Sequence, residues 1–174
     1  MFVPASRNLM DPIMRAMEKD VRHEPKREVT AAILAWWFKR PGHLDLLYDA
    51  LENGRDQLSL KAAMARASFE AGHWEEAATQ ALLVIGRKPS ANLMHSVRGQ
   101  SLAKLGRWNE GVDSLRRSVR GDTVDTGLLC AAALAWIEHG DLEEAEELLV
   151  QAEKAAPKDT RVRRAMLALR AEKK

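Results

Sequence analysis

The stretch that decides the fold is AGHWEEAATQALLV (71–84), which returns as LGRWNEGVDSLRRS (105–118) and as HGDLEEAEELLVQA (139–152). The glycines near the start of these segments, Gly72, Gly106 and Gly140, are separated by 34 residues each time. Two equal intervals with no insertion are not expected of unrelated helices, and a period of this length is typical of stacked supersecondary units. The sequence therefore predicts an array of repeats.

Each unit contains two stretches of 12–14 residues with apolar or small residues at three- and four-residue spacing, which is typical of helices buried along one stripe. The turn glycine permits a positive φ and ends the first helix. Acidic pairs, Glu75-Glu76 and Glu143-Glu144, open two of the second helices and favour the positive end of the helix dipole. One unit cannot bury its own apolar face, so we expect the units to stack over a continuous core.

With the turn glycine as position 15, the units begin at Leu58, Asn92 and Thr126, and they resemble the tetratricopeptide repeat (TPR). That family has small residues at positions 8 and 20, a bulky residue at position 17 and proline at position 32. The matching residues are Ala65, Gly99 and Ala133 at position 8, Ala77, Gly111 and Ala145 at position 20, Trp74, Trp108 and Leu142 at position 17, and Pro89 and Pro157 at position 32. The second unit has Thr123 in place of the proline, so we expect its exit turn to depend on 121–123.

The resemblance implies an all-α fold, a right-handed α-α superhelix with capping helices at both ends. We expect one domain with three parts: an N-terminal arm and degenerate helical cap (1–57), three repeats (58–157) and a C-terminal capping helix (158–174). No segment alternates as a strand does.

The flanking segments are predicted to be helical as well. Asp11-Pro12 starts a helix to about residue 23, and its stripe of Met10, Met14, Met17 and Val21 either caps the first helix pair or joins two chains as a homodimer. Residues 28–40 and 43–53 form a repeat-like pair that departs from the period. The last helix runs from Thr160, as its cap, to about residue 171, and its basic residues form either a solvated face or a docking patch for an acidic partner.

The composition argues against several classes of protein. A net charge of +2 favours neither nucleic acid nor an anionic membrane surface. The longest apolar run, 31–38, is far short of the roughly 20 residues that span a bilayer. The single cysteine, Cys130, excludes an internal disulfide and fits a reducing compartment, and the N-terminus has no signal-peptide pattern. We expect a cytoplasmic protein.

The sequence contains no catalytic constellation. No two of the five histidines have the four-residue spacing of a helical zinc site, so we expect them at turns or in solvent. Cys130 lies on an apolar helix and is expected to be a packed thiol. There is no glycine-rich phosphate loop, and the acidic residues 143–147 indicate a solvated helix start. We therefore expect no metal, no cofactor and no enzyme activity.

The TPR resemblance also implies a binding surface, because the first helices of such arrays line a concave groove. The residues at groove positions that we expect to bind a partner are Arg66, Phe69, Val97, Gln100, Cys130, Leu134 and Ile137. Relatives that hold a chaperone's carboxylate tail use Lys and Asn at positions 5 and 9, and that clamp is absent here. What remains is apolar, and an exposed apolar patch usually marks a partner site. The alternative occupant is the chain's own arm, with Phe2, Val3 and Pro4.

The interpretation is a protein–protein interaction module, an adaptor that holds an extended or helical segment of a partner. The layout is also similar to type III secretion chaperones, which have three such repeats, an N-terminal dimerisation extension and a capping helix, and this resemblance implies a hydrophobic secreted substrate. A small enzyme is the least favoured interpretation.

Overall fold

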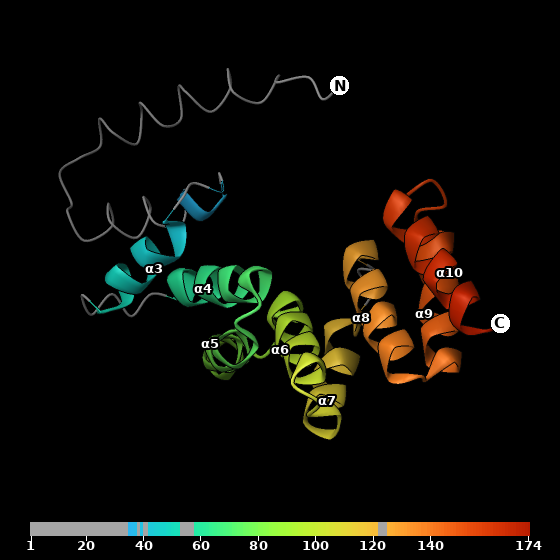
Figure 1. The fold of residues 1–174 in the computed structure, drawn as a ribbon, viewed down its shortest axis with the longest axis horizontal. Coiled ribbons are helices and arrows are strands. Elements are labelled where there is room, and N and C mark those ends of the chain that lie inside the picture. The colour runs from blue at the N-terminus through green and yellow to red at the C-terminus, as the bar shows by residue number, and fades with distance from the viewer. Residues whose placement is uncertain (1–34, 38, 40–41, 53–57, 122–124) are drawn as a thin grey trace, which may run out of the picture. The chain divides into compact units, whose positions relative to one another are not determined.

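The computed structural model describes residues 35–37, 39, 42–52, 58–121 and 125–174, and every regular element among them is a helix (Figure 1). The chain separates into two compact units, residues 1–56 and residues 57–174. The first unit contains α3 (His43–Glu52), which follows Gly42 at φ +73° and buries Leu47 and Ala50. The predicted helix at 11–23, the arm before it and most of 28–40 lie outside the described residues.

The second unit contains the three predicted helix pairs and one further helix. They are α4 (Leu58–Ala71) with α5 (Trp74–Arg87), α6 (Asn92–Lys104) with α7 (Trp108–Ser118), α8 (Thr126–His139) with α9 (Leu142–Ala155), and α10 (Thr160–Glu172). The first helix of each pair begins at the residue that the 34-residue period predicts. The all-helical repeat architecture is confirmed.

The turns inside the three pairs are built alike. The turn glycines Gly72, Gly106 and Gly140 have φ of +83°, +73° and +97°, a region that L side chains rarely adopt. The residue after each glycine donates its N–H to the carbonyl five residues back: His73 to Ser68 (2.8 Å), Arg107 to Leu102 (2.8 Å) and Asp141 to Trp136 (3.0 Å). This capping pattern satisfies carbonyls at the end of the first helix. Pro89 and Pro157 lie in the turns after α5 and α9.

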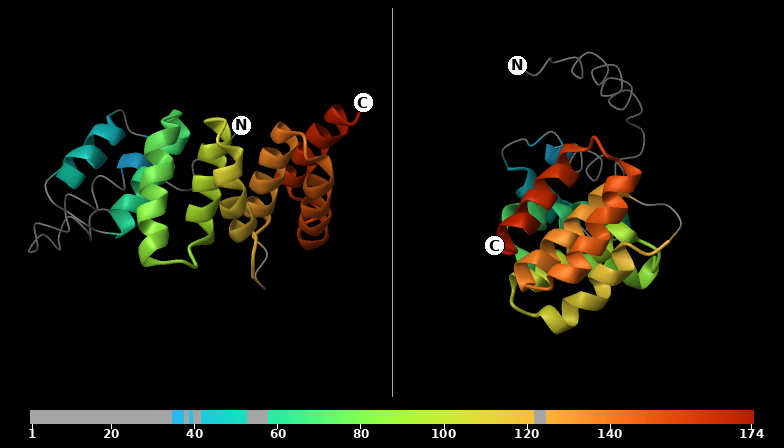
Figure 2. Two further views of the ribbon diagram at one scale, coloured as in Figure 1. Left: turned by 90° about the horizontal axis from the view of Figure 1, so that it is seen from below. Right: turned by 90° about the vertical axis from the view of Figure 1, so that its right-hand side faces the viewer.

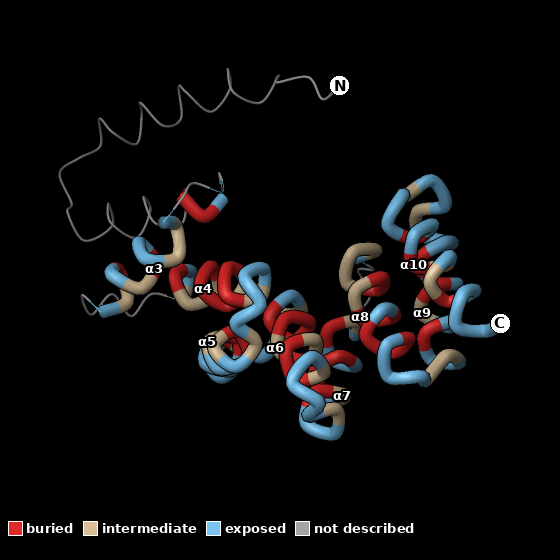
Figure 3. Tube along the Cα trace, in the orientation of Figure 1, coloured by how far each residue is buried: buried red, intermediate tan, exposed pale blue. Residues whose placement is uncertain are grey.

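The small residues at positions 8 and 20 hold the helices of each pair together. Ala65, Ala77, Ala133 and Ala145 are fully buried. In the second pair the approach is closer, because a Cβ built on Gly99 would lie 2.6 Å from Leu115 Cγ and 2.9 Å from the Leu115 backbone nitrogen. A side chain at position 99 would therefore force α6 and α7 apart. The buried positions follow the helix pairs as bands in Figure 3.

Each pair contacts the first helix of the next pair through both of its own helices, and α5 makes the larger contact with α6 at the first junction. α4 contacts α6, α6 contacts α8, and α8 contacts α10, whereas the second helices α5, α7 and α9 of the described chain do not contact one another. Because the first helices of successive pairs touch and the second helices do not, the array of pairs curves. The first helices α4, α6 and α8 lie on the inner side of this curve. Figure 2 shows these helices from two further directions.

The last helix covers the third pair, as predicted. Val162, Ala165 and Leu169 of α10 enter the core formed by α8 and α9, which includes Leu149 and Ala152. The predicted cap is wrong by one residue: Asp159, not Thr160, precedes the helix, and its side chain accepts a hydrogen bond from the Arg161 N–H at 2.8 Å. Aspartate is a stronger cap than threonine because its carboxylate also favours the helix dipole.

Candidate functional site

The candidate site is the inner face, which we define by Arg66 on α4, Leu93, Gln100 and Ala103 on α6, and Ala131 and Leu134 on α8. Leu93 and Leu134 are 43% and 39% exposed, so two large apolar side chains lie open on it. Gln100 and Ala103 on α6 and Ala131 on α8 are half-buried. The face is therefore apolar, with little that projects from it.

Three residues that we expected to bind a partner are buried in the array instead. Val97 is 5% exposed and packs with residues of α4 and α5. Ile137 is 8% exposed, Cys130 is buried as well, and both belong to the core of α8, α9 and α10. The expectation of exposed side chains at these positions is wrong, because α6 packs against α4 and α5 around Val97, and α8 packs against α9 and α10 around Cys130 and Ile137.

Phe69 and Arg66 lie in the second half of α4, the first of the inner helices. Phe69 is half-buried, and its ring meets that of Trp74 edge to face with 5.1 Å between centroids. Phe69 thus stabilises the turn of its own repeat and offers only part of its ring to a partner. Arg66 is half-buried too, and it is the cation of the inner face on α4.

Two polar contacts lie on the inner side of the array, one within α6 and one between α6 and α8. Gln100 Nε2 donates to Ser96 Oγ at 2.9 Å, one helical turn away. Lys104 Nζ lies 2.6 Å and 2.7 Å from the two carboxylate oxygens of Glu138, and both residues occupy position 13 of their repeats. This ion pair links equivalent positions of neighbouring repeats, and because both side chains are half-exposed it contributes little to stability.

The start of α8 and the start of α10 carry a cluster of charges near Cys130. Arg161 Nη2 lies 2.6 Å from Asp159 Oδ2, and hydrogen bonds from Arg161 lower the pKa of the Asp159 carboxyl. Burial raises the pKa of the Cys130 thiol, with a further contribution from the Asp159 charge. A protonated, buried thiol is a poor nucleophile, so Cys130 packs rather than reacts.

Two of the described histidines, His95 and His139, make structural contacts. His95 is buried, contrary to the expectation of a turn or solvent position, and its Nε2–H donates to the Pro89 carbonyl at 2.8 Å. His139 stacks on Trp108 with 3.9 Å between ring centroids, and its Nδ1 lies 2.8 Å from Asp141 Oδ2. Across the described ranges no group of three His, Cys, Asp or Glu residues is placed to hold a metal ion.

A search of the helices in the described part of the chain found none that is both long enough and apolar enough to cross a bilayer.

Solved structures with the same arrangement include two of MamA. MamA MSR-1 superposes on 84% of this chain and 84% of its own length with a TM-score of 0.65, at 14% sequence identity. MamA AMB-1 does so over 82% of this chain and 80% of its own with a TM-score of 0.59, at 18% identity. A thermophilic TPR protein of Thermus thermophilus is 19% identical over 83% of this chain and 98% of its own, with a TM-score of 0.47. No protein-family model and no curated protein matches the sequence.

At these identities the likeness shows a shared fold. Together with three 34-residue helix pairs, positive-φ turn glycines and small residues at positions 8 and 20, it defines the chain as a TPR-like helical repeat array.

Leu93 stands at position 2 of the second repeat, a groove position of the TPR, and is the most exposed large apolar side chain of the inner face. Its position in the repeat indicates that it faces the groove, but it was not among the residues that we expected to bind a partner. His139 was expected to be a turn residue, and its stacking on Trp108 depends on how α7 meets α8, which no local pattern reveals.

Proposed function

We propose that the chain is a non-catalytic protein-interaction module that holds an apolar segment of a partner protein on its inner face. The observation that supports this most is the exposure of Leu93 and Leu134 on that face, among residues too small to shield them. Each Å² of apolar surface that a partner covers contributes about 25 cal/mol. Two half-exposed leucines therefore favour association with a segment that carries large apolar side chains.

The binding residues of this proposal are Leu93, Gln100, Ala131 and Leu134, with Arg66 and Phe69 at the edge. Gln100 keeps one carboxamide oxygen for a backbone N–H of the partner, since its Nε2 is engaged by Ser96. The half-buried Arg66 offers an electrostatic contact to an acidic group of the partner. Val97, Cys130 and Ile137 contribute by holding the helices that carry these side chains.

The test replaces the two exposed leucines with glutamate. Leu93→Glu and Leu134→Glu, separately and together, are expected to abolish capture of the partner while helicity and melting temperature stay near the parent values. Leu82→Glu is the matched control, because Leu82 is similarly exposed on α5, a helix of the outer side. A photocrosslinking residue at position 134 identifies the bound segment. If the double variant stays folded and still captures that segment, the inner face is not the binding site.

The same experiment separates the kinds of partner. A stable subunit of a complex at position 134 supports an adaptor, and a hydrophobic secreted protein supports a secretion chaperone. A crosslink to residues 1–10 of the same chain would show that the arm occupies the face, and deleting those residues would then raise partner affinity. We place the protein in the cytoplasm, a proposal that rests on its single, buried cysteine.

A further inference from the structure

The ends of α5 and α7 meet the start of α6 at one edge of the second repeat. The turn after α5 closes when the Ala91 N–H donates to the Lys88 carbonyl at 3.1 Å, so Lys88 lies close to the start of α6. The end of α7 lies beside the same turn, because Asn92 Nδ2 donates to the Arg120 carbonyl at 3.1 Å. We define the basic rim as Lys88, Arg117 and Arg120, which are exposed at this edge.

The sequence supplies little negative charge to balance the basic rim. It has no aspartate or glutamate at 77–109 or at 114–121. On α7, Glu110 is already in an ion pair, which leaves Asp113 as the other carboxylate of that helix, and Asp122 lies outside the described residues. In the described part of the chain, none of the three rim side chains makes an ion pair. This edge therefore keeps an excess of positive charge.

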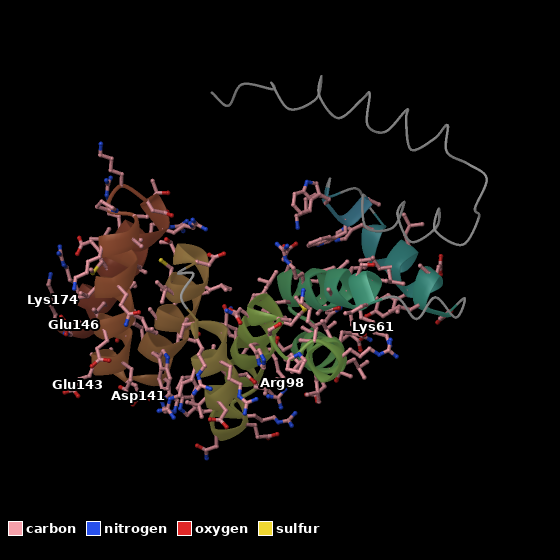
Figure 4. All side chains as sticks on the ribbon, turned by 180° about the vertical axis from the view of Figure 1, so that it is seen from behind. Lys61, Arg98, Asp141, Glu143, Glu146 and Lys174 are labelled. Carbon is pink, nitrogen blue, oxygen red and sulfur yellow. The ribbon has the colours of Figure 1, made fainter. Side chains whose placement is uncertain are left out.

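The start of α6 adds to this positive charge instead of cancelling it. Lysine and arginine favour the C-terminal ends of α5 and α7, but the N-terminal end of a helix is itself partially positive. Ala91 caps α6 without a side-chain hydrogen bond and the first turn has no acidic residue, whereas Asp125 caps α8 with its carboxylate. Figure 4 shows Glu143 and Glu146 of α9 well apart from Arg98 of α6, so these acidic side chains lie away from α6.

The basic rim borders the inner face at Leu93. This leucine directly follows Asn92, the residue whose amide holds the Arg120 carbonyl, and its side chain is 43% exposed. Leu134, the other exposed leucine of the inner face, lies on the next first helix, α8. A segment that covers both leucines and continues past Leu93 therefore passes from an apolar surface to a positively charged one.

We propose that the segment held on the inner face has an apolar stretch, which lies on Leu93 and Leu134, and an adjoining acidic stretch, whose carboxylates pair with the basic rim. This inference rests on the proposed function and names the chemistry of its partner. Carboxylates fit the rim because a guanidinium donates two parallel hydrogen bonds to them. The charge also sets the direction of the segment, with its acidic end toward the turn between α5 and α6.

An acidic protein segment fits the rim better than a nucleic acid or an anionic membrane does. Proteins that bind polyanions by charge make many phosphate contacts, and the net charge of this chain is only +2. The surface next to the rim carries the exposed Leu93, and an exposed apolar surface favours a partner with apolar side chains. A polypeptide supplies both apolar and acidic side chains in one chain.

The test compares two peptides, acetylated and amidated at their ends so that only side chains carry charge. One has a leucine-rich stretch followed by a run of glutamates, and the other has glutamines in their place. Fluorescence anisotropy measures the binding of each to the full chain. The glutamate peptide should bind about tenfold more tightly, since each exposed ion pair contributes modestly. This preference should shrink as salt is raised, because salt screens exposed charges.

The variants separate this inference from the proposed function. Arg117→Gln with Arg120→Gln should remove the preference, so that the two peptides bind alike, and Arg170→Gln, an exposed arginine of α10, is the control that should keep it. Leu93→Glu with Leu134→Glu should abolish binding of both peptides. If the parent chain binds both peptides equally, the inference is wrong and the proposed function stands. If the parent binds neither, the proposed function fails and the inference with it.

A charge reversal gives a result that unfolding cannot imitate. With Arg117→Glu and Arg120→Glu, a peptide that has lysines in place of the glutamates should bind more tightly than the glutamate peptide. An unchanged preference for the glutamate peptide would overturn the inference. So would tighter, rim-dependent binding of phosphatidylserine vesicles or of a single-stranded oligonucleotide than of the glutamate peptide, because the rim would then serve a membrane or a nucleic acid.

Discussion

Trp74 and Trp108 occupy position 17 of the first and second repeats, yet their rings serve different contacts. Trp74 meets Phe69 of its own repeat. Trp108 instead lies against the first helix of the next repeat, edge to face with Trp136 at 4.7 Å and stacked on His139. The difference follows from the connections: α5 passes through Pro89 to α6 and contacts it extensively, whereas α7 is shorter and meets α8 sparsely. The ring of Trp108 therefore supplies much of the packing between α7 and α8, which make few other contacts.

The largest effect is therefore expected from Trp108→Ala. Truncating a buried aromatic side chain costs about 3–5 kcal/mol, and the half-buried Trp108 should lie near the lower value. Trp74→Ala removes one edge-to-face pair and less buried area, and should cost about 1–2 kcal/mol. Urea unfolding followed by circular dichroism measures both. Equal losses for the two variants would show that Trp108 does not couple the second repeat to the third.

Gly99→Ala is expected to be next in size. The added methyl would clash with Leu115, including its backbone nitrogen, and overpacking of this kind costs about 1–3 kcal/mol. Gly86→Ala on α5 is the matched control, because no atom lies within 4 Å of the added Cβ. There the change should stabilise by up to about 1 kcal/mol through helix propensity. The two Gly→Ala changes should thus have opposite signs in the same unfolding assay.

These contacts also show which parts of the molecule could be derived from the sequence. The period places the glycine turns, the close approach at Gly99 and the start of each helix, because those features depend on neighbours within one repeat. The exposure of Val97 and Ile137 was predicted wrongly, because it depends on how closely two successive repeats approach. The stacking of Trp108 on His139 belongs to the same class: the two residues are 31 positions apart, and no spacing rule connects them.

Helix capping offers a smaller test of the junctions. Asp125 accepts hydrogen bonds from the N–H groups of Gly127 (2.8 Å) and Leu128 (3.2 Å) at the start of α8. Asp125→Ala should therefore cost about 1 kcal/mol. Asp141 precedes α9 without such a bond, so Asp141→Ala should cost less, limited to its exposed contact with His139. Melting temperatures of the two variants measured side by side decide this, and equal losses would argue against the cap at α8.

The smallest expected effect is a change in acid sensitivity at the start of α10. Hydrogen bonds from the Arg161 side chain and backbone lower the pKa of Asp159 below its ordinary value of 3.8. A carboxyl whose pKa is lower in the folded state stabilises the fold above that ordinary value, and the contribution is lost as pH falls through the folded pKa.

Asp159→Asn removes this titration while its amide oxygen can still cap the helix. The melting temperature of the variant should therefore fall less than that of the parent between about pH 5 and about pH 2.5. Asp113→Asn, on the exposed side of α7, is the control and should follow the parent curve. A variant whose melting temperature falls as steeply as the parent's would mean that the pair with Arg161 does not persist in solution, and that α10 is held mainly by its apolar contacts through Val162, Ala165 and Leu169.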